Sequence, residues 1–374
     1  AADELGPLQG SFGAVNGPAG ALVAVFGYND GTIRAGTAYG TAASGIRRST
    51  SAEFTSEDAY VLVDSAGTPR FPIRAGTDAA SVANPLTVAE VRAVLEEAFA
   101  VLGRSRAQIR RPLDSRMQAS ISMVDTHGAI LGVVRSPDGP IFGTDVSLQK
   151  ARTAAFFSNR VAAAQMQAAG GAVAGYVQRI RSFLGDANAL TGNFAFADRS
   201  GGNLSRPYFP DGEVGDVAGP LSVERPGQFS PFMTGLQTDL ILPNLVEHLG
   251  FVISGGASAD TPRGCTQLPD APGGGKRIGN GIQIFPGSVP IYRGDELVGG
   301  IGVSGDGIDQ DDMVSFLGLH NAGQRVGGIG NARVDIRADR IVVSVNGRNV
   351  RLRYVNCPFA PFLDDPRQNV CEGL

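Results

Sequence analysis

Three histidines, His127, His248 and His320, are the residues of this 374-residue chain whose type best suits metal coordination. Conventional catalytic motifs do not accompany them: GxSxG, HExxH and a Walker loop are missing from the sequence. The GGGK run at 273–276 lacks the following Ser or Thr, and the DGIDQDD segment lacks the closing Glu of a calcium-binding loop. The sequence therefore predicts neither metal catalysis nor a conventional enzyme.

Each histidine also has an ordinary structural interpretation. His127 falls in the Thr126–Gly128 turn between two expected strands, where an exposed side chain is the simplest expectation. His248 falls on an apolar helix expected near 236–249. His320 ends an expected helix, where a histidine interacts favourably with the helix dipole.

Residues 287–322 are predicted to form a strand hairpin followed by a helix. Val289–Tyr292 and Leu297–Val303 are the two strands, and Asp309, Asp311 and Asp312 start the helix, where acidic side chains suit the dipole. A glycine-rich strand before a helix can bind an anion. Glycine in a strand also marks close packing of neighbouring backbone, which is the interpretation favoured here.

The middle of the chain contains two further helices and a second hairpin. Residues 86–103 have a helical apolar period and begin with a capping box, Thr87 and Glu90. Gln118–Asp125 and Ala129–Arg135 alternate like paired strands. The next helix is predicted over Thr144–Phe157, with Thr144 as its N-cap.

Four segments carry a family resemblance: LTVAEVRAVLEEA, SMVDTHGAILGVVRSPDG, DVSLQKARTAAFFS and VPIYRGDELVGGIGVSGDGIDQDD. In this order they resemble the GlcG/HbpS-type family of haem-binding or haem-degrading proteins, over residues 86–168 and 280–320. The resemblance implies an α+β fold, with an antiparallel sheet flanked by helices. It also implies assembly into oligomers.

The resemblance also implies a haem pocket beside the helix DVSLQKARTAAF, which would involve Asp145, Lys150 and Thr153. Within such a pocket, a lysine can pair with a haem propionate. Covalent attachment is excluded because the sequence has no CxxCH. His127 and His320 are then the candidate axial ligands, and haem is the expected cofactor.

Three regions are predicted along the chain. Residues 1–85 read as a small β-rich module, with strands at Ala21–Phe26 and Asp58–Asp64. Residues 86–330 form the GlcG/HbpS-like domain, interrupted by an insertion at 171–279. Residues 331–374 form a C-terminal hairpin, which turns at Asn346-Gly347, and a tail.

The insertion is expected to contain helices at Val173–Leu184 and Leu236–Leu249, joined by a long loop. A loop of this length within a compact domain is usually functional or part of an interface. Its aromatic and arginine side chains can cover a ligand, contact a partner or pack on the host domain: Phe194, Phe196, Arg199, Arg206, Tyr208 and Phe209.

Composition bears on partners and location. A net charge of -4 with 18% charged residues disfavours nucleic acid as a partner, and no apolar run of 18 residues is present to span a membrane.

The chain starts Ala-Ala-Asp without Met, as expected after signal-peptide removal. Cys357 and Cys371 are the candidate disulfide of an exported protein, and Cys265 is left over or takes one of these partners. A periplasmic or extracellular location is predicted.

The sequence thus supports two hypotheses. The first is an exported protein that binds haem or a related tetrapyrrole, in haem handling or redox sensing. The second is a non-catalytic structural or interaction subunit of a periplasmic or extracellular assembly, with an empty pocket. Either protein would form a homo-oligomer or enter a larger complex.

Overall fold

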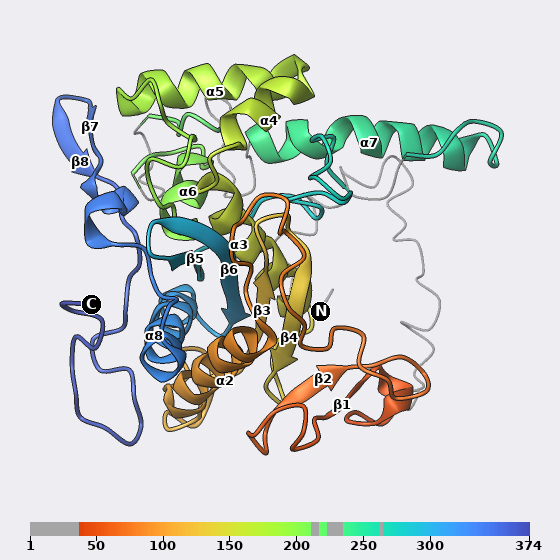
Figure 1. Ribbon diagram of the computed structural model, residues 1–374, viewed down its shortest axis with the longest axis vertical. Coiled ribbons are helices and arrows are strands. Elements are labelled where there is room, and N and C mark those ends of the chain that lie inside the picture. Colours follow the sequence, from red (N-terminus) through yellow and green to blue (C-terminus); the bar gives the residue numbers. More distant parts are fainter. Residues whose placement is uncertain (1–36, 211–216, 223–234, 262–264) are drawn as a thin grey trace, which may run out of the picture. The chain divides into compact units, whose positions relative to one another are not determined.

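A six-stranded antiparallel sheet lies at the centre of the computed structural model, which describes residues 37–210, 217–222, 235–261 and 265–374 (Figure 1). The strand order is β1-β2-β4-β3-β6-β5. The predicted strands at 118–125, 129–135, 289–292 and 297–303 are all present. The strand bounds are β1 Ile46–Arg48, β2 Tyr60–Leu62, β3 Ala119–Val124, β4 Ile130–Arg135, β5 Ser288–Arg293 and β6 Glu296–Gly305.

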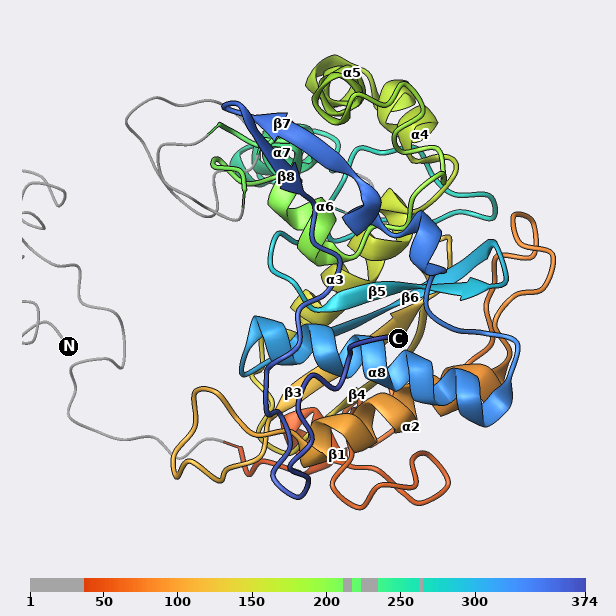
Figure 2. The same ribbon diagram turned by 90° about the vertical axis from the view of Figure 1, so that its left-hand side faces the viewer.

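Two helices cover one face of the sheet, α2 (Val88–Arg104) and α8 (Ile308–Val326) (Figure 2). The predicted capping box starts α2: the Thr87 side chain accepts from the Glu90 N–H, and the Glu90 carboxylate accepts from the Thr87 N–H. Asp309 and Asp311 lie in the first turn of α8, as predicted. The core between these two helices and the sheet contains strand side chains such as Ile121 and Ile301. The predicted α+β fold is confirmed.

Helix α3 (Gly143–Phe157) covers the other face and packs against β6 at backbone distance. A Cβ atom added at Gly302 would lie 2.1 Å from the Ser147 carbonyl oxygen, and one at Gly300 would lie 2.5 Å from the Ala151 oxygen. The glycines of β6 therefore serve close packing of strand against helix. The predicted Thr144 N-cap is wrong, because the helix begins one residue earlier and its N-cap, Phe142, makes no side-chain cap.

Between α3 and β5, the described residues form four helices. The predicted helices at 173–184 and 236–249 are present, and α7 runs further than predicted, with Pro243 inside it. The sequence did not predict α4 or the short α6. The bounds are α4 Ala162–Ala169, α5 Gly171–Leu184, α6 Asp198–Leu204 and α7 Gly235–Ile253. Among the described residues, no helix is both long enough and apolar enough to cross a bilayer.

The first strands described, β1 and β2, extend the main sheet. The predicted strand at 58–64 is present as β2, which pairs with β4 where Tyr60 faces Arg135. The predicted strand at 21–26 lies outside the described residues. Residues Tyr39–Leu374 form one compact unit, and the predicted boundaries at residues 85 and 330 stay predictions.

The C-terminal hairpin is also present, as β7 (Val342–Val345) and β8 (Arg348–Arg351). Asn346 and Gly347 have φ angles of 48° and 75°, as the Asn-Gly turn predicted. Cys357 and Cys371 form the predicted disulfide, whereas Cys265 is free and exposed. The described residues also contain three single-turn 3₁₀ helices: Ala42–Ser44, Val334–Ile336 and Ala338–Arg340.

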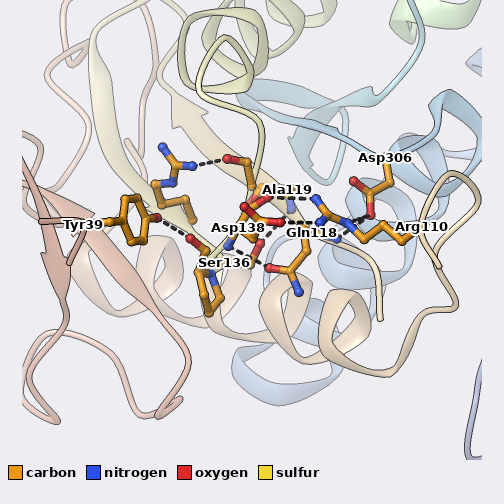
Figure 3. A network of polar contacts seen from close by, with 10 residues as sticks. Tyr39, Arg110, Gln118, Ala119, Ser136, Asp138 and Asp306 are labelled. Atoms are coloured by element: carbon orange, nitrogen blue, oxygen red, sulfur yellow. Dashed lines mark hydrogen bonds and ion pairs between the residues drawn. The ribbon is translucent and has the colours of Figure 1, made fainter. Parts of the chain in front are cut away.

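A polar network closes the end of the sheet where β3 begins (Figure 3). Arg110 Nε donates to the buried Asp306 carboxylate at 2.7 Å, and its Nη1 pairs with Asp138. The Gln118 N–H donates to the same Asp306 oxygen at 3.0 Å, while Tyr39 donates to the Pro137 carbonyl. The opposite end of β3, at the His127 turn, is where the candidate site lies.

Candidate functional site

The three predicted residues of α3 make structural contacts. Asp145 is exposed and accepts from Asn280 Nδ2 at 3.0 Å. Thr153 is buried and accepts from the Gln283 N–H at 2.8 Å, which ties the segment before β5 to the helix. Lys150 is buried in an ion pair described below. None of the three lines either pocket described here, and their role toward a cofactor stays a prediction.

A buried ionic cluster joins α3, α6 and α8. Lys150 Nζ lies 2.8 Å from Asp311 Oδ2, and both side chains are 2% exposed. Arg199 pairs with Asp309 at 2.6 Å and with the fully buried Asp312. Arg199, one of the two arginines of the predicted aromatic loop, therefore packs on the host domain. Each of these five charged side chains pairs with one from another element of the chain.

Asp198 adds a carboxylate without a direct partner. It is fully buried, and neither of its side-chain oxygens has a hydrogen-bond partner. Burial raises its pKa well above the ordinary value, against the opposing charges of Lys150, Arg206 and Arg199. Burial also raises the pKa of Asp311 and of Asp312 to about 6. This cluster therefore binds protons more tightly in the folded state than in the unfolded state.

We expect an Asp198→Asn variant to lose stability less steeply than the wild type as pH rises from 5 to 8. A raised folded-state pKa gives stability that is present below the unfolded value near 4 and is lost as pH rises through the folded value. Urea unfolding at pH 5 and pH 8 measures the difference, with the exposed Asp114→Asn as control. Equal pH slopes in all three proteins would refute the expectation.

A pocket of about 560 Å³ opens beside the β3–β4 turn, at the end of the sheet away from Arg110. We call it the His127 pocket. It combines cationic, apolar and glycine-rich parts of the chain, and the residues lining it are Arg70, Phe71, Pro72, Arg74, Thr77, His127, Gly128, Ala129, Ile130, Arg152, Pro272, Gly273, Gly274, Gly275 and Lys276.

The buried Asp125 carboxylate fixes the turn that carries His127. One oxygen accepts the N–H groups of His127 and Ala129, both at 3.0 Å, and the other accepts from Thr77. His127 is only 5% exposed, and its Nε2 lies 2.7 Å from Ser81 Oγ. The expectation of a solvent-exposed His127 is wrong, because these contacts hold the turn against the residues before α2.

Arg152 is a half-buried cation of the His127 pocket. Its Nε donates to the Gly128 carbonyl at 3.0 Å and its Nη1 to Asn280 Oδ1 at 2.6 Å, both neutral acceptors. Arg152, Arg70 and Arg74 form no ion pair with any described residue, whereas Lys276 pairs with Asp270 at 2.9 Å. Burial lowers the pKa of Arg152, although the guanidinium stays charged. This pocket is suited to an anion.

The other two histidines do not join His127. His320 is half-buried on α8, and the helix continues to Val326, so the prediction that His320 ends the helix is wrong. His248 is exposed on α7, with Nδ1 2.7 Å from Asp260 Oδ1. Neither lines the His127 pocket. Within the part of the chain that the structure describes, no three His, Cys, Asp or Glu side chains are grouped to hold a metal ion.

Sequence reasoning missed the arginines of the His127 pocket. Arg70 and Arg74 lie in one segment between β2 and α2, whereas Arg152 comes from α3, and no sequence spacing links it to the other two. The GGGK run was the one local signal, since Gly273, Gly274 and Gly275 all have φ angles between 83° and 90° and line the pocket. Such backbone favours glycine.

Comparisons with known proteins agree with the predicted resemblance in the C-terminal part of the chain. A family model described as "Haem degrading protein HbpS-like" matches residues 253–320. The match includes the β5–β6 hairpin and most of α8, and it begins within the predicted insertion. The segment at 86–168 lies outside it. No curated protein matches the chain.

Two solved structures were also found, both at low identity. One is the crystal structure of a PduOC:heme complex, with 13% identity, a TM-score of 0.27, and coverage of 64% of this chain and 95% of that one. The other is the Klebsiella pneumoniae protein ORFY, with 18% identity, a TM-score of 0.27, and coverage of 67% and 92%. Over residues 253–320, this chain is therefore similar to the HbpS-like family that the sequence resemblance indicated.

Proposed function

We propose that the chain is an exported protein that binds haem, or a related tetrapyrrole, in the His127 pocket. The observation that carries the proposal is Arg152, a half-buried guanidinium without a carboxylate partner, in the same pocket as Arg70 and Arg74. Arginine pairs strongly with carboxylates, and haem carries two propionates. The HbpS-like match supports a haem-related role.

The residues of this pocket fit such a ligand in size and polarity. A volume of about 560 Å³ is within the usual range for small-molecule sites. Phe71 and Ile130 offer apolar contact for the ring system, and the arginines would hold its acidic edge. His127 is the one haem-ligand type in the lining, and its Nδ1 is the nitrogen that Ser81 does not occupy. Bound haem would supply an iron that changes oxidation state, as redox sensing requires.

The proposed function includes export to an oxidising compartment and assembly into an oligomer or a larger complex. The Cys357–Cys371 disulfide suits an oxidising compartment such as the periplasm or the extracellular space. A homo-oligomer or a larger complex would explain why apolar side chains remain exposed on the second half of α7, including Leu245, Leu249 and Ile253.

We expect haemin to produce a Soret band with the wild-type protein, and Arg152→Gln to weaken haemin binding at least tenfold by removing a propionate partner. His127→Ala should shift the Soret band and alter the α and β bands after dithionite, if His127 ligates the iron. Titration followed by ultraviolet-visible absorption measures both effects. His248→Ala, on the exposed helix α7, is the matched control and should bind like the wild type.

A spectrum that remains clean after haemin addition would refute haem binding. The exposed apolar residues of α7 would then favour the second candidate, a non-catalytic subunit of an exported assembly. Equal affinities of Arg152→Gln, His248→Ala and the wild type would place any haem outside the His127 pocket.

A further inference from the structure

We propose that the chain has a second ligand site, which binds a small hydroxylated organic anion such as a sugar acid or a sugar phosphate. The site is a pocket of about 430 Å³, here called the Arg277 pocket, which shares no lining residue with the His127 pocket. Its lining is Ser81, Val82, Thr126, Ser158, Asn159, Arg160, Val161, Thr191, Gly192, Arg277, Tyr292, Asp295, Glu296 and Leu297.

Arg277 is the residue that indicates an anionic ligand. Its side chain is 4% exposed, yet it makes no hydrogen bond or ion pair with any described residue. Its Nε is fully buried without an acceptor. An unpaired buried charge is costly, and a buried arginine is normally matched by a carboxylate or a phosphate. Because Arg277 lines the pocket, a ligand placed there can supply the missing partner.

The nearest buried carboxylates do not serve as that partner. Asp125 and Asp78 attract Arg277 only through space. Asp125 is committed to the backbone of the His127 turn and to Thr77. Asp78 Oδ2 accepts from the Thr126 N–H at 2.9 Å and from its hydroxyl at 2.6 Å. Their charges lower the cost of burying Arg277 and leave its N–H groups for another acceptor.

The backbone of Arg277 packs directly against the turn that carries His127. Gly128, at φ +78°, is so close that an added Cβ would lie 2.3 Å from the Arg277 carbonyl oxygen. The same turn is fixed by Asp125. Because the Arg277 side chain is buried and its Nε has no acceptor, an anion that reaches it replaces no existing contact.

The rest of the lining favours a ligand with hydroxyl groups. Tyr292 is 3% exposed, and its hydroxyl lies close to Ser158 without a hydrogen bond of ordinary geometry. Ser81, Thr126 and Thr191 add hydroxyl oxygens, and Asp295 and Glu296 add carboxylates. Each already has one contact within the chain, and its remaining lone pairs can accept from a ligand hydroxyl. Donors and acceptors around the buried Arg277 match a polyhydroxylated molecule that carries an anionic group.

The test uses d-gluconate and d-glucose 6-phosphate as anionic probes and d-glucose as the neutral control. We expect at least one anion to raise the melting temperature of the full chain with saturation, and glucose to have no effect. Gluconate alone would assign a carboxylate, and the phosphate ester alone would assign a phosphate. Isothermal titration of the Arg277→Met variant should show at least a tenfold loss of affinity.

The melting temperature of unliganded Arg277→Met separates a binding role from a structural one. Removing an unpaired buried charge should leave it unchanged or raise it, since methionine preserves much of the side-chain volume. Arg70→Gln, in the His127 pocket, is the control and should keep anion binding. Tyr292→Phe preserves packing and should weaken the binding of both anions.

Three results would overturn the proposal. One is a marked drop in the melting temperature of unliganded Arg277→Met, or failure of that variant to fold, because Arg277 would then be a structural residue. Another is an equal anion effect in Arg277→Met and the wild type. The third is the absence of any saturable anion effect in the wild type. None of these depends on whether haem binds in the His127 pocket.

Discussion

Replacement of Lys150 by methionine is expected to lower the free energy of unfolding by about 3–5 kcal/mol, because it leaves a buried carboxylate without its cation. Lys150 Nζ lies 2.8 Å from Asp311 Oδ2 and 2.9 Å from the Val303 carbonyl oxygen. Both ionic side chains are 2% exposed, so water cannot replace the lost partner. Urea unfolding at pH 7.5 measures the change.

The double variant Lys150→Met/Asp311→Leu is the matched test of this explanation. Replacing both members of a buried ion pair with apolar side chains is often neutral or stabilising. We therefore expect it to recover most of the stability that Lys150→Met loses.

Unfolding at acidic pH is a second test, since burial raises the pKa of Asp311 to about 6. The defect of Lys150→Met should shrink at pH 5, where Asp311 is largely protonated. A defect that persists in the double variant and at pH 5 would point to lost packing of the lysine stem instead.

Gly302→Ala is expected to destabilise the protein by about 3 kcal/mol or more, at the upper end of the range for overpacked cores. The new methyl carbon would lie 2.1 Å from the Ser147 carbonyl oxygen and 2.5 Å from the Ala151 nitrogen. These are backbone atoms of α3, so relief requires the helix to move away from β6. Thermal and urea unfolding measure the loss.

Gly103→Ala is the control with the opposite expected sign. Gly103 lies inside α2, and a Cβ there would meet no atom within 4 Å. Alanine favours the helix over glycine by about 0.5–1 kcal/mol, so this variant should be more stable than the wild type. A Gly302→Ala variant as stable as the wild type would mean that α3 and β6 are not packed as closely as the structure shows.

The elements that the sequence predicted well are those whose signals are local. The Asn346-Gly347 turn and the Thr87–Glu90 capping box each act within a few residues, and both are present in the structure. The glycines of β6 were also informative, because their spacing in a strand indicated close backbone packing. The family resemblance added the order of the sheet and helix segments, which local patterns do not determine.

The candidate site was less predictable because its chemistry depends on tertiary contacts. Nothing near His127 in the sequence shows that Ser81 and Asp125 bury it. A lysine is ordinarily exposed, yet Lys150 is enclosed by Val303 and Asp311, which lie far along the chain. Arg277 likewise follows Lys276 in an apparently ordinary basic pair, and only the fold assigns the two residues to different pockets.

The pairing of β3 with β6 has a consequence for protein synthesis. Val124 pairs with Gly300, roughly 180 residues later in the chain, whereas the other edge of β3 pairs with the nearby β4. At typical elongation rates, on the order of 10–40 s passes between emergence of the first hairpin and emergence of its remaining neighbour. During that time one edge of β3 has unpaired backbone groups. The nascent chain is then most exposed to aggregation, and a chaperone that shields this hairpin would raise the yield of folded protein.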